Sequence, residues 1–200
     1  MERLAIFVSG SGTNMENLVR EIKAGRIGGA EAALVVSDNP EAKAIQKALA
    51  LGVDTAVVDR KNFSTKAEFE VEIIRHLEMK QIGWIALAGF MRILSPGFVR
   101  RFGGRILNIH PSLLPAFPGA HGIRDAWEAG TKESGATVHF VDEGVDTGVT
   151  ILQKTVARGA EDTLESFEAK IHAVEYEIYP EALRLVFSGK VRPPVSPAGA

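Results

Sequence analysis

Continuous apolar runs alternate with amphipathic segments along most of this 200-residue chain. The runs at residues 4–8 and 84–88 are apolar at every position, as in strands that are buried on both faces of a sheet. The segments between such runs carry apolar residues at helical spacing. Because strands that alternate with helices form parallel sheets covered by helices, this order predicts an α/β fold.

We expect a Rossmann-like domain, in which helices flank a mostly parallel central sheet of about seven strands and the last strands run antiparallel. The expected strands span residues 4–8, 32–37, 54–58, 83–88, 105–109, 135–141 and 149–156. The expected helices span residues 13–24, 41–51, 65–79, 96–101, 121–129 and 162–187. Pro180 lies inside the last helix and should kink it.

Length and composition narrow the class of protein. A chain of this size predicts one domain, here residues 1–189, and the proline-rich end at 190–200 reads as a loosely attached tail. The formal net charge of −2 offers no basic face for nucleic acid or an anionic membrane, so small molecules are the expected ligands.

The residue types that are missing exclude further classes. The chain has no cysteine, which rules out disulfides and thiolate catalysis. The first apolar run, at 4–8, is far shorter than the roughly 20 residues that span a membrane, so we expect a cytoplasmic protein, either a monomer or a homodimer.

A polar pair, Asn108 and His110, closes one of the apolar runs. Residues two apart in a strand point to the same side, so both side chains should lie together while Leu107 and Ile109 face a core. Pro111 then stops the strand at its carboxyl end, where open α/β sheets place their binding sites. Burying the pair without partners would cost about 2 kcal/mol or more, so other groups must hydrogen-bond it.

A glycine loop, residues 9–14 with the sequence SGSGTN, follows the first strand and precedes a helix. Paired glycines let backbone N–H groups approach an anion, which favours a phosphate site. A second interpretation is a tight turn with Thr13 or Asn14 as the helix N-cap. A third is a dinucleotide site with Asp38 on the ribose, although Met15 stands where that motif needs its third glycine.

An apolar loop, the 88–95 segment, follows the fourth expected strand. In the doubly wound order the first and fourth strands are neighbours, so this segment and the glycine loop should flank one crevice. Apolar side chains exposed together would form a lip for a flat ring. The alternative is a hydrophobic staple before a short helix at Pro96, with Arg92 in solvent. The expected lip consists of Phe90, Met91, Ile93 and Leu94.

An acidic loop, residues 142–148 with the sequence DEGVDTG, separates two strand-like runs. By itself it is typical of any surface turn. A carboxylate beside an imidazole orients the ring and favours its charged form, which makes a general acid available. Asp146 is the candidate for this role beside His110.

The other histidines fit less specific roles. His76 lies mid-helix among charged residues on a solvated face, and His139 reads as a sheet residue with a supporting role. His121 could cap a helix or line the site, and His172 shares a helix face with Glu175 as either a functional edge or a surface pair. No spacing matches a metal triad, so we expect no metal.

Four motifs together carry a family resemblance. They are SGSGTN at 9–14, AGFMRILS at 88–95, NIHPSLLP at 108–115 and VHFVDEGVDTG at 138–148. In this order and spacing the chain, from about residue 4 to 188, resembles the phosphoribosylglycinamide formyltransferases of the folate-dependent formyltransferase superfamily. The third motif is common to the superfamily, and the first two select this family within it.

The resemblance implies formyl transfer from 10-formyltetrahydrofolate, as cosubstrate, to the amine of glycinamide ribonucleotide in de novo purine biosynthesis. The implied catalytic residues are Asn108, His110 and Asp146. The implied acceptor-binding residues, for its phosphate and amine, are Ser11, Gly12, Thr13, Asn14, His172 and Glu175. The implied folate-binding residues are Lys66, Phe90, Met91, Arg92, Ile93, Leu94, Asn108, Asp142, Glu143, Gly144, Val145 and Asp146.

The chain departs from the family pattern at two positions. Lys66 stands where an arginine is frequent, which keeps the charge and loses the planar fork. Ala116 stands where lysine is frequent, so any electrostatic help from that position is absent. His121 and His139 match recurrent family histidines and are expected to support the site.

The chemistry also suits the residues themselves. An amine that attacks a formamide carbon forms a tetrahedral oxyanion, which needs hydrogen-bond donors aimed at it. The Asn108 amide and an imidazolium at His110, kept charged by Asp146, would supply them. The proton from the amine would then pass to the folate nitrogen through His110 or a bound water.

Three alternatives remain at this level. A formyltetrahydrofolate hydrolase shares this chemistry but resembles a longer chain with an amino-terminal regulatory domain. A methionyl-tRNA formyltransferase would need an RNA-binding domain and a basic surface. A non-catalytic nucleotide-binding module would use only the glycine loop and Asp38.

Overall fold

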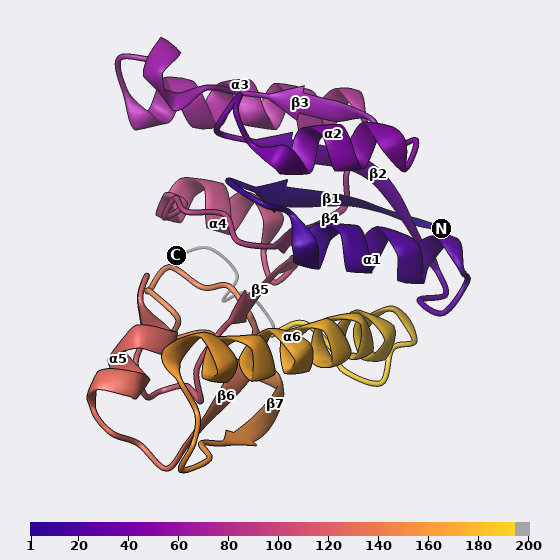
Figure 1. Cartoon of the computed structure of the whole chain (residues 1–200). Coiled ribbons are helices and arrows are strands. Elements are labelled where there is room, and N and C mark those ends of the chain that lie inside the picture. Colours follow the sequence, from indigo (N-terminus) through magenta and orange to yellow (C-terminus); the bar gives the residue numbers. More distant parts are fainter. Residues whose placement is uncertain (195–200) are drawn as a thin grey trace.

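One seven-stranded sheet forms the centre of the molecule in the computed structural model, which describes residues 1–194 (Figure 1). The strands are β1 (Glu2–Val8), β2 (Ala30–Ser37), β3 (Thr55–Val57), β4 (Trp84–Leu87), β5 (Ile106–His110), β6 (Glu133–Phe140) and β7 (Thr150–Ala157). The helices are α1 (Thr13–Lys23), α2 (Lys43–Ala50), α3 (Lys66–Met79), α4 (Pro96–Phe102), α5 (Gly122–Glu128) and α6 (Leu164–Phe187), with a 3₁₀ turn η1 (Arg60–Asn62).

The strand order is β3-β2-β1-β4-β5-β6-β7. The pairs from β3 to β5 are parallel, whereas β5–β6 and β6–β7 are antiparallel. This confirms the expected mostly parallel sheet with antiparallel last strands. The winding reverses between β1 and β4, which are hydrogen-bonded neighbours, so the loops that follow them meet at one edge of the sheet.

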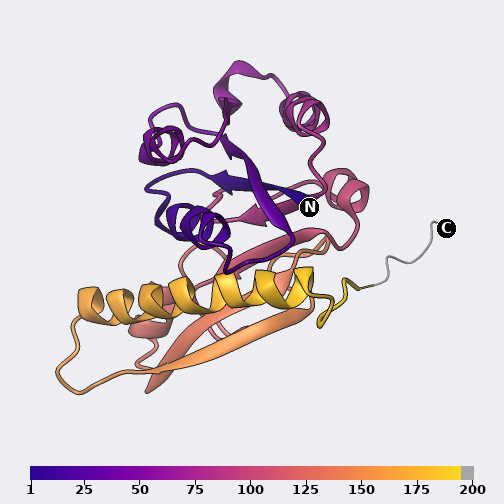
Figure 2. The ribbon, with the colours of Figure 1, turned by 90° about the vertical axis from the view of Figure 1, so that its right-hand side faces the viewer.

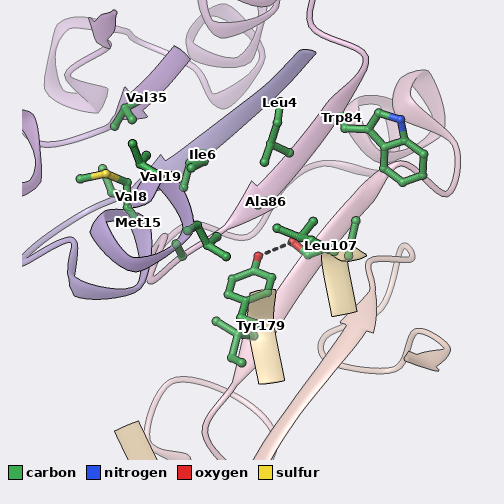
Figure 3. Close-up of a cluster of buried hydrophobic side chains, with 14 of the residues drawn as sticks. Leu4, Ile6, Val8, Met15, Val19, Val35, Trp84, Ala86, Leu107 and Tyr179 are labelled. Atoms are coloured by element: carbon green, nitrogen blue, oxygen red, sulfur yellow. Dashed lines mark hydrogen bonds between the residues drawn. The ribbon is translucent and has the colours of Figure 1, made fainter. Parts of the chain in front are cut away.

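Helices cover both faces of the sheet, and the period of two along the strands decides which side chain joins which core. Leu4 and Ile6 pack with α1, α2 and α6, and Figure 3 shows this cluster around Tyr179. Ala5 and Phe7 point to the other face and pack with α3 and α4. This two-sided burial explains why β1 from Leu4 onward and all of β4 are apolar at every position.

The long helix α6 lies across the antiparallel end of the sheet and beside α1 (Figure 2). Thr163 caps its amino terminus in a capping box with Ser166. The helix continues through Pro180 without interruption to Phe187. Its fully buried Tyr179 donates its hydroxyl to the carbonyls of Leu87, at 2.9 Å, and Leu107, at 3.3 Å. The last helix is thereby tied to the carboxyl-terminal half of β4 and to β5.

The end of the described chain leaves α6 along the surface of the domain. The Val191 N–H donates to the Leu185 carbonyl, and the Val191 side chain packs against the larger core. The remainder of the expected tail, residues 195–200, lies outside the described residues. No helix within residues 1–194 has the length and apolar character needed to cross a lipid bilayer.

Candidate active site

A cavity of about 580 Å³ opens at the point where the winding of the sheet reverses. Its volume lies within the usual range for small-molecule sites. Most of its lining comes from the glycine loop, the 87–94 stretch after β4, the carboxyl end of β5, the acidic loop and α6. The structure therefore brings the separately predicted motifs to one place.

The glycine loop reaches the cavity from the amino terminus of α1. Gly12 is the N-cap with φ 68°, and no side chain caps the helix, so the alternative of Thr13 or Asn14 as N-cap is wrong. A Cβ at this position would clash with Ala44 of α2, which explains why the loop needs glycine here. The first N–H groups of α1 are thus left free of side-chain caps beside the cavity.

Asn14 carries a buried acceptor without a partner. Its amide nitrogen donates to Glu175 Oε2 at 3.1 Å, while its Oδ1 is buried and makes no hydrogen bond within residues 1–194. Both residues line the cavity. A hydroxyl or amine proton of a ligand would satisfy this oxygen.

The predicted polar pair lies at the end of β5, as its spacing indicated. Asn108 pairs across the strands with His139 of β6, and its Nδ2 lies 3.2 Å from His139 Nε2 and 3.4 Å from Asp146 Oδ1. The Nδ1 of His139 donates to the Phe140 carbonyl at 2.8 Å, and its Nε2 faces Asn108 and Asp146. The amide of Asn108 is therefore oriented by His139 and Asp146 together.

His110 is buried between two acceptors. Its Nδ1 lies 3.5 Å from Asp146 Oδ2, and its Nε2 lies 2.8 Å from the Phe117 carbonyl. An imidazolium donates from both nitrogens and suits this arrangement. In this structure Nε2 faces the Phe117 carbonyl, and the donation from His110 to an oxyanion stays a prediction.

Asp146 connects these groups. Burial opposes its charge, but the nearby His139 ring, the Gly119 N–H and the charge of His110 hold the pKa of the Asp146 carboxyl below its ordinary value. The Gly119 N–H donates to Oδ2 at 2.8 Å. Asp146 therefore remains an anion beside His110 at neutral pH.

His172 and Glu175 form the α6 side of the cavity. His172 Nδ1 lies 2.7 Å from Glu175 Oε2, and His172 Nε2 lies 3.3 Å from Glu168 Oε1. The hydrogen bond with Glu175 raises the pKa of His172 against the effect of burial, and Glu168 adds to the rise. The pair is linked through Asn14 to the glycine loop and lines the same cavity.

The 88–95 segment forms the apolar wall, in a different way from the expected lip. Met91 and Ile93 are 68% and 66% exposed, whereas Phe90 and Leu94 are buried. The expectation that all four are exposed is wrong for the last two, because Phe90 packs edge-on against Phe7 and Leu94 joins the same core. Two buried residues thus anchor the segment and two present apolar surface.

Two residues of the expected folate site lie outside the cavity lining. Lys66 is exposed at the start of α3, 3.9 Å from Glu70, and Glu143 pairs with Arg100 at 2.8 Å. The remaining residues named from the sequence for folate or acceptor line the cavity. Among residues 1–194, no group of three or more histidines and carboxylates is arranged to hold a metal ion.

Two residues contribute more to the site than their sequence pattern indicated. His139 orients Asn108, and only the antiparallel register of β5 and β6 places it there. Ser9 joins two motifs, since its hydroxyl accepts from the Met91 N–H at 2.8 Å and its own N–H donates to the Gly89 carbonyl at 3.1 Å. Its position beside the glycines was the available signal.

Comparison with known proteins agrees with the fold and the cavity. The model of the family described as formyl transferase matches residues 2–183. The chain therefore belongs to the formyl transferase family.

Similar proteins narrow the class further. Phosphoribosylglycinamide formyltransferase of Bacillus subtilis (strain 168) is 44% identical over 184 residues, which are 92% of this chain and 94% of that protein. The crystal structure of phosphoribosylglycinamide formyltransferase from Bacillus halodurans superposes with a TM-score of 0.91 at 44% identity, over 95% of this chain and 97% of that one. Within the family, the chain groups with the phosphoribosylglycinamide formyltransferases.

A further relative is much longer. The trifunctional purine biosynthetic protein adenosine-3 of Drosophila pseudoobscura pseudoobscura is 44% identical over 192 residues, which are 96% of this chain but 14% of that protein. The similarity to it concerns that segment alone.

Proposed function

We propose that the chain transfers the formyl group of 10-formyltetrahydrofolate to the amine of glycinamide ribonucleotide, a step of purine biosynthesis. The observation that carries the proposal is the cluster of Asn108, His110 and Asp146 in the wall of a cavity that also contains the glycine loop. The phosphate of the acceptor belongs at the free N–H groups of α1. Its amine belongs near Glu175, and a ribose hydroxyl suits the unpaired Asn14 Oδ1.

The folate belongs against the 88–95 segment and the acidic loop. Met91 and Ile93 offer apolar surface to its flat ring, and Val145, also exposed, faces the cavity from the acidic loop. Lys66 and Glu143 lie outside the lining, so they would meet only a part of the folate that extends beyond the cavity.

The reaction forms a bond between the acceptor nitrogen and the formyl carbon and breaks the bond from that carbon to the folate nitrogen. The oxyanion between these steps takes hydrogen bonds from the Asn108 amide and the His110 imidazolium. The amine proton leaves for the folate nitrogen through His110 or a bound water.

The structure adds one requirement to this mechanism. His110 must exchange its 2.8 Å contact with the Phe117 carbonyl for one with the oxyanion, or donate from the nitrogen that faces Asp146. Because Asp146 stays charged, it stabilises the imidazolium throughout.

The cavity is complete within one chain, so a monomer and a homodimer are both consistent with the proposal. We place the reaction in the cytoplasm, with small molecules as the only partners it requires.

The test is a spectroscopic assay of folate deformylation, with and without glycinamide ribonucleotide. We expect turnover only with the acceptor. Turnover that ignores the acceptor would identify a hydrolase instead.

Variants of the catalytic cluster test the assigned roles. His110→Ala and Asp146→Ala should fold normally and lose about 10²–10³-fold in kcat, as expected for the loss of one oxyanion donor or its support. Full activity in either variant would refute the assignment.

A further inference from the structure

Asp38 is a buried carboxylate that the proposed reaction leaves without a role. It follows the last residue of β2, and its side chain is 3% exposed. Its Oδ2 accepts from Arg92 Nε at 2.6 Å, and its Oδ1 has no hydrogen-bond partner within residues 1–194. A buried charge is tolerated when an opposite charge is paired with it. Arg92 is the group that compensates the charge of Asp38.

Arg92 spans from this buried carboxylate to the cavity. Its side chain is half exposed and lines the cavity wall, and one of its five N–H donors is used on Asp38. The planar guanidinium is held at Nε, which fixes the direction in which its outer nitrogens point. Arg92 belongs to the part of the cavity lining that the proposed function gives to the folate.

The 88–95 segment has no regular secondary structure, so its shape depends on a few fixed points. Ser9 holds its amino end through Gly89 and Met91. Glu70 holds its carboxyl end by accepting from the N–H of Ser95, at 2.7 Å, and from its hydroxyl. Between these ends, the Asp38 contact is the only ion pair that the segment makes among residues 1–194.

We propose that Asp38 is a positioning residue for the folate half of the site, which acts by fixing the Arg92 guanidinium and, with it, the middle of the 88–95 segment. The identity of the ligand rests on the proposed function, whereas the role of the ion pair rests on the contacts above.

The test is a double-mutant cycle of Asp38→Asn and Arg92→Gln, because an amide of the same size removes the charge and keeps the shape. Asp38→Asn should raise the KM for 10-formyltetrahydrofolate about threefold to tenfold, less than the full loss of a charge-assisted hydrogen bond, because Arg92 is half exposed. The kcat and the KM for glycinamide ribonucleotide should stay within about twofold. The double variant should be no worse than Arg92→Gln alone.

Asp54→Asn is the matched control, since it removes another aspartate that pairs with a cation, Lys80, and neither residue lines the cavity. The kcat and the KM for 10-formyltetrahydrofolate should be unchanged in Asp54→Asn. Asp38→Glu keeps the charge, so its KM for 10-formyltetrahydrofolate should be closer to the parental value than that of Asp38→Asn. This variant tests the proposal even if Asp38→Asn does not fold.

Two direct measurements separate this proposal from the proposed function. Calorimetric titration with tetrahydrofolate reports folate binding even if the chain transfers no formyl group. A nitrogen-15 spectrum should show a slowly exchanging Arg92 Nε–H that Asp38→Asn abolishes. An additive cycle, an unchanged folate affinity in Asp38→Asn, or a persistent Nε–H signal would each overturn the role of Asp38.

Discussion

At the scale of single residues, several polar side chains of the site contact one carboxylate, that of Asp146. Asp146 lies within 3.6 Å of atoms of Asn108, His110 and His139. The polar pair at the end of β5 was predictable from a spacing of two residues. Its third partner, His139, was expected only to support the site, and its contact with Asn108 could not be predicted because neither strand alone determines the register of an antiparallel pair.

We expect His172 to make acceptor binding sensitive to pH. Its pKa is raised, mainly by Glu175, so the ring keeps its charge to a higher pH than an ordinary histidine and loses it as the pH rises through that raised pKa. The buried Glu175 is then left uncompensated near the bound phosphate. We expect the KM for glycinamide ribonucleotide to rise about threefold to tenfold between neutral and alkaline pH, as measured by initial rates.

Two variants check the origin of this pH dependence. His172→Lys should remove it, because a lysine keeps its charge through the same range. His172→Gln should show the higher KM at every pH. A glutamine variant that keeps the parental pH profile would assign the effect to another group.

At the scale of elements, the glycine loop depends on the close approach of α1 and α2. Gly12 has φ 68°, and a Cβ there would clash with Ala44, whereas Gly10 has no heavy atom within 4 Å of such a Cβ. The motif was recognisable from sequence as a strand, two glycines and a helix. The second glycine, Gly12, is needed because of Ala44 in α2, about 30 residues further on. A pattern of neighbouring residues cannot show this contact.

Gly12→Ala should therefore destabilise the protein by about 2–4 kcal/mol, the sum of a left-handed backbone and a crowded contact. It should also weaken acceptor binding, because the loop must shift. Gly10→Ala is the matched control and should change the free energy of unfolding by less than about 0.5 kcal/mol. Urea denaturation measures both, and equal effects of the two substitutions would refute the role of the α1–α2 contact.

At the scale of the whole molecule, the cavity joins parts of the chain that are far apart in sequence. β1 and β4 meet where the winding reverses, and α6 returns across the sheet to place His172 and Glu175 beside the glycine loop (Figure 2). A ligand in this cavity contacts both halves of the sheet. Its binding should therefore stabilise the entire fold.

Glycinamide ribonucleotide at about 100 times its Kd should raise the free energy of unfolding by about 2.7 kcal/mol. For a domain of this size that is an increase of about 5–10 °C in Tm, measured by thermal denaturation. The same compound without its phosphate, at equal concentration, should shift the Tm much less. Stabilisation by NAD and none by the ribonucleotide would favour the nucleotide-binding module.

The element order and the face of each strand were determined by the sequence itself. The seven strands and six helices of residues 1–194 follow from apolar periodicity, because an element that must bury one face or two repeats its apolar residues accordingly, and their alternation predicts a mostly parallel sheet. Expected boundaries differ from the observed ones by one or two residues, except that η1 was not foreseen. The pairing of Asn108 with His110 follows from the same periodicity.

Only the tertiary structure decided which polar groups meet. Phe90 and Leu94 are buried, and Asp38 pairs with Arg92. Lys66 and Glu143 lie outside the cavity lining, and His110 contacts the Phe117 carbonyl. Periodicity along the chain reports how deep a side chain lies, because burial depends on local geometry. Hydrogen bonds and ion pairs need two atoms within about 3 Å of each other. When the two atoms belong to segments far apart in the sequence, only the packing of those segments sets that distance.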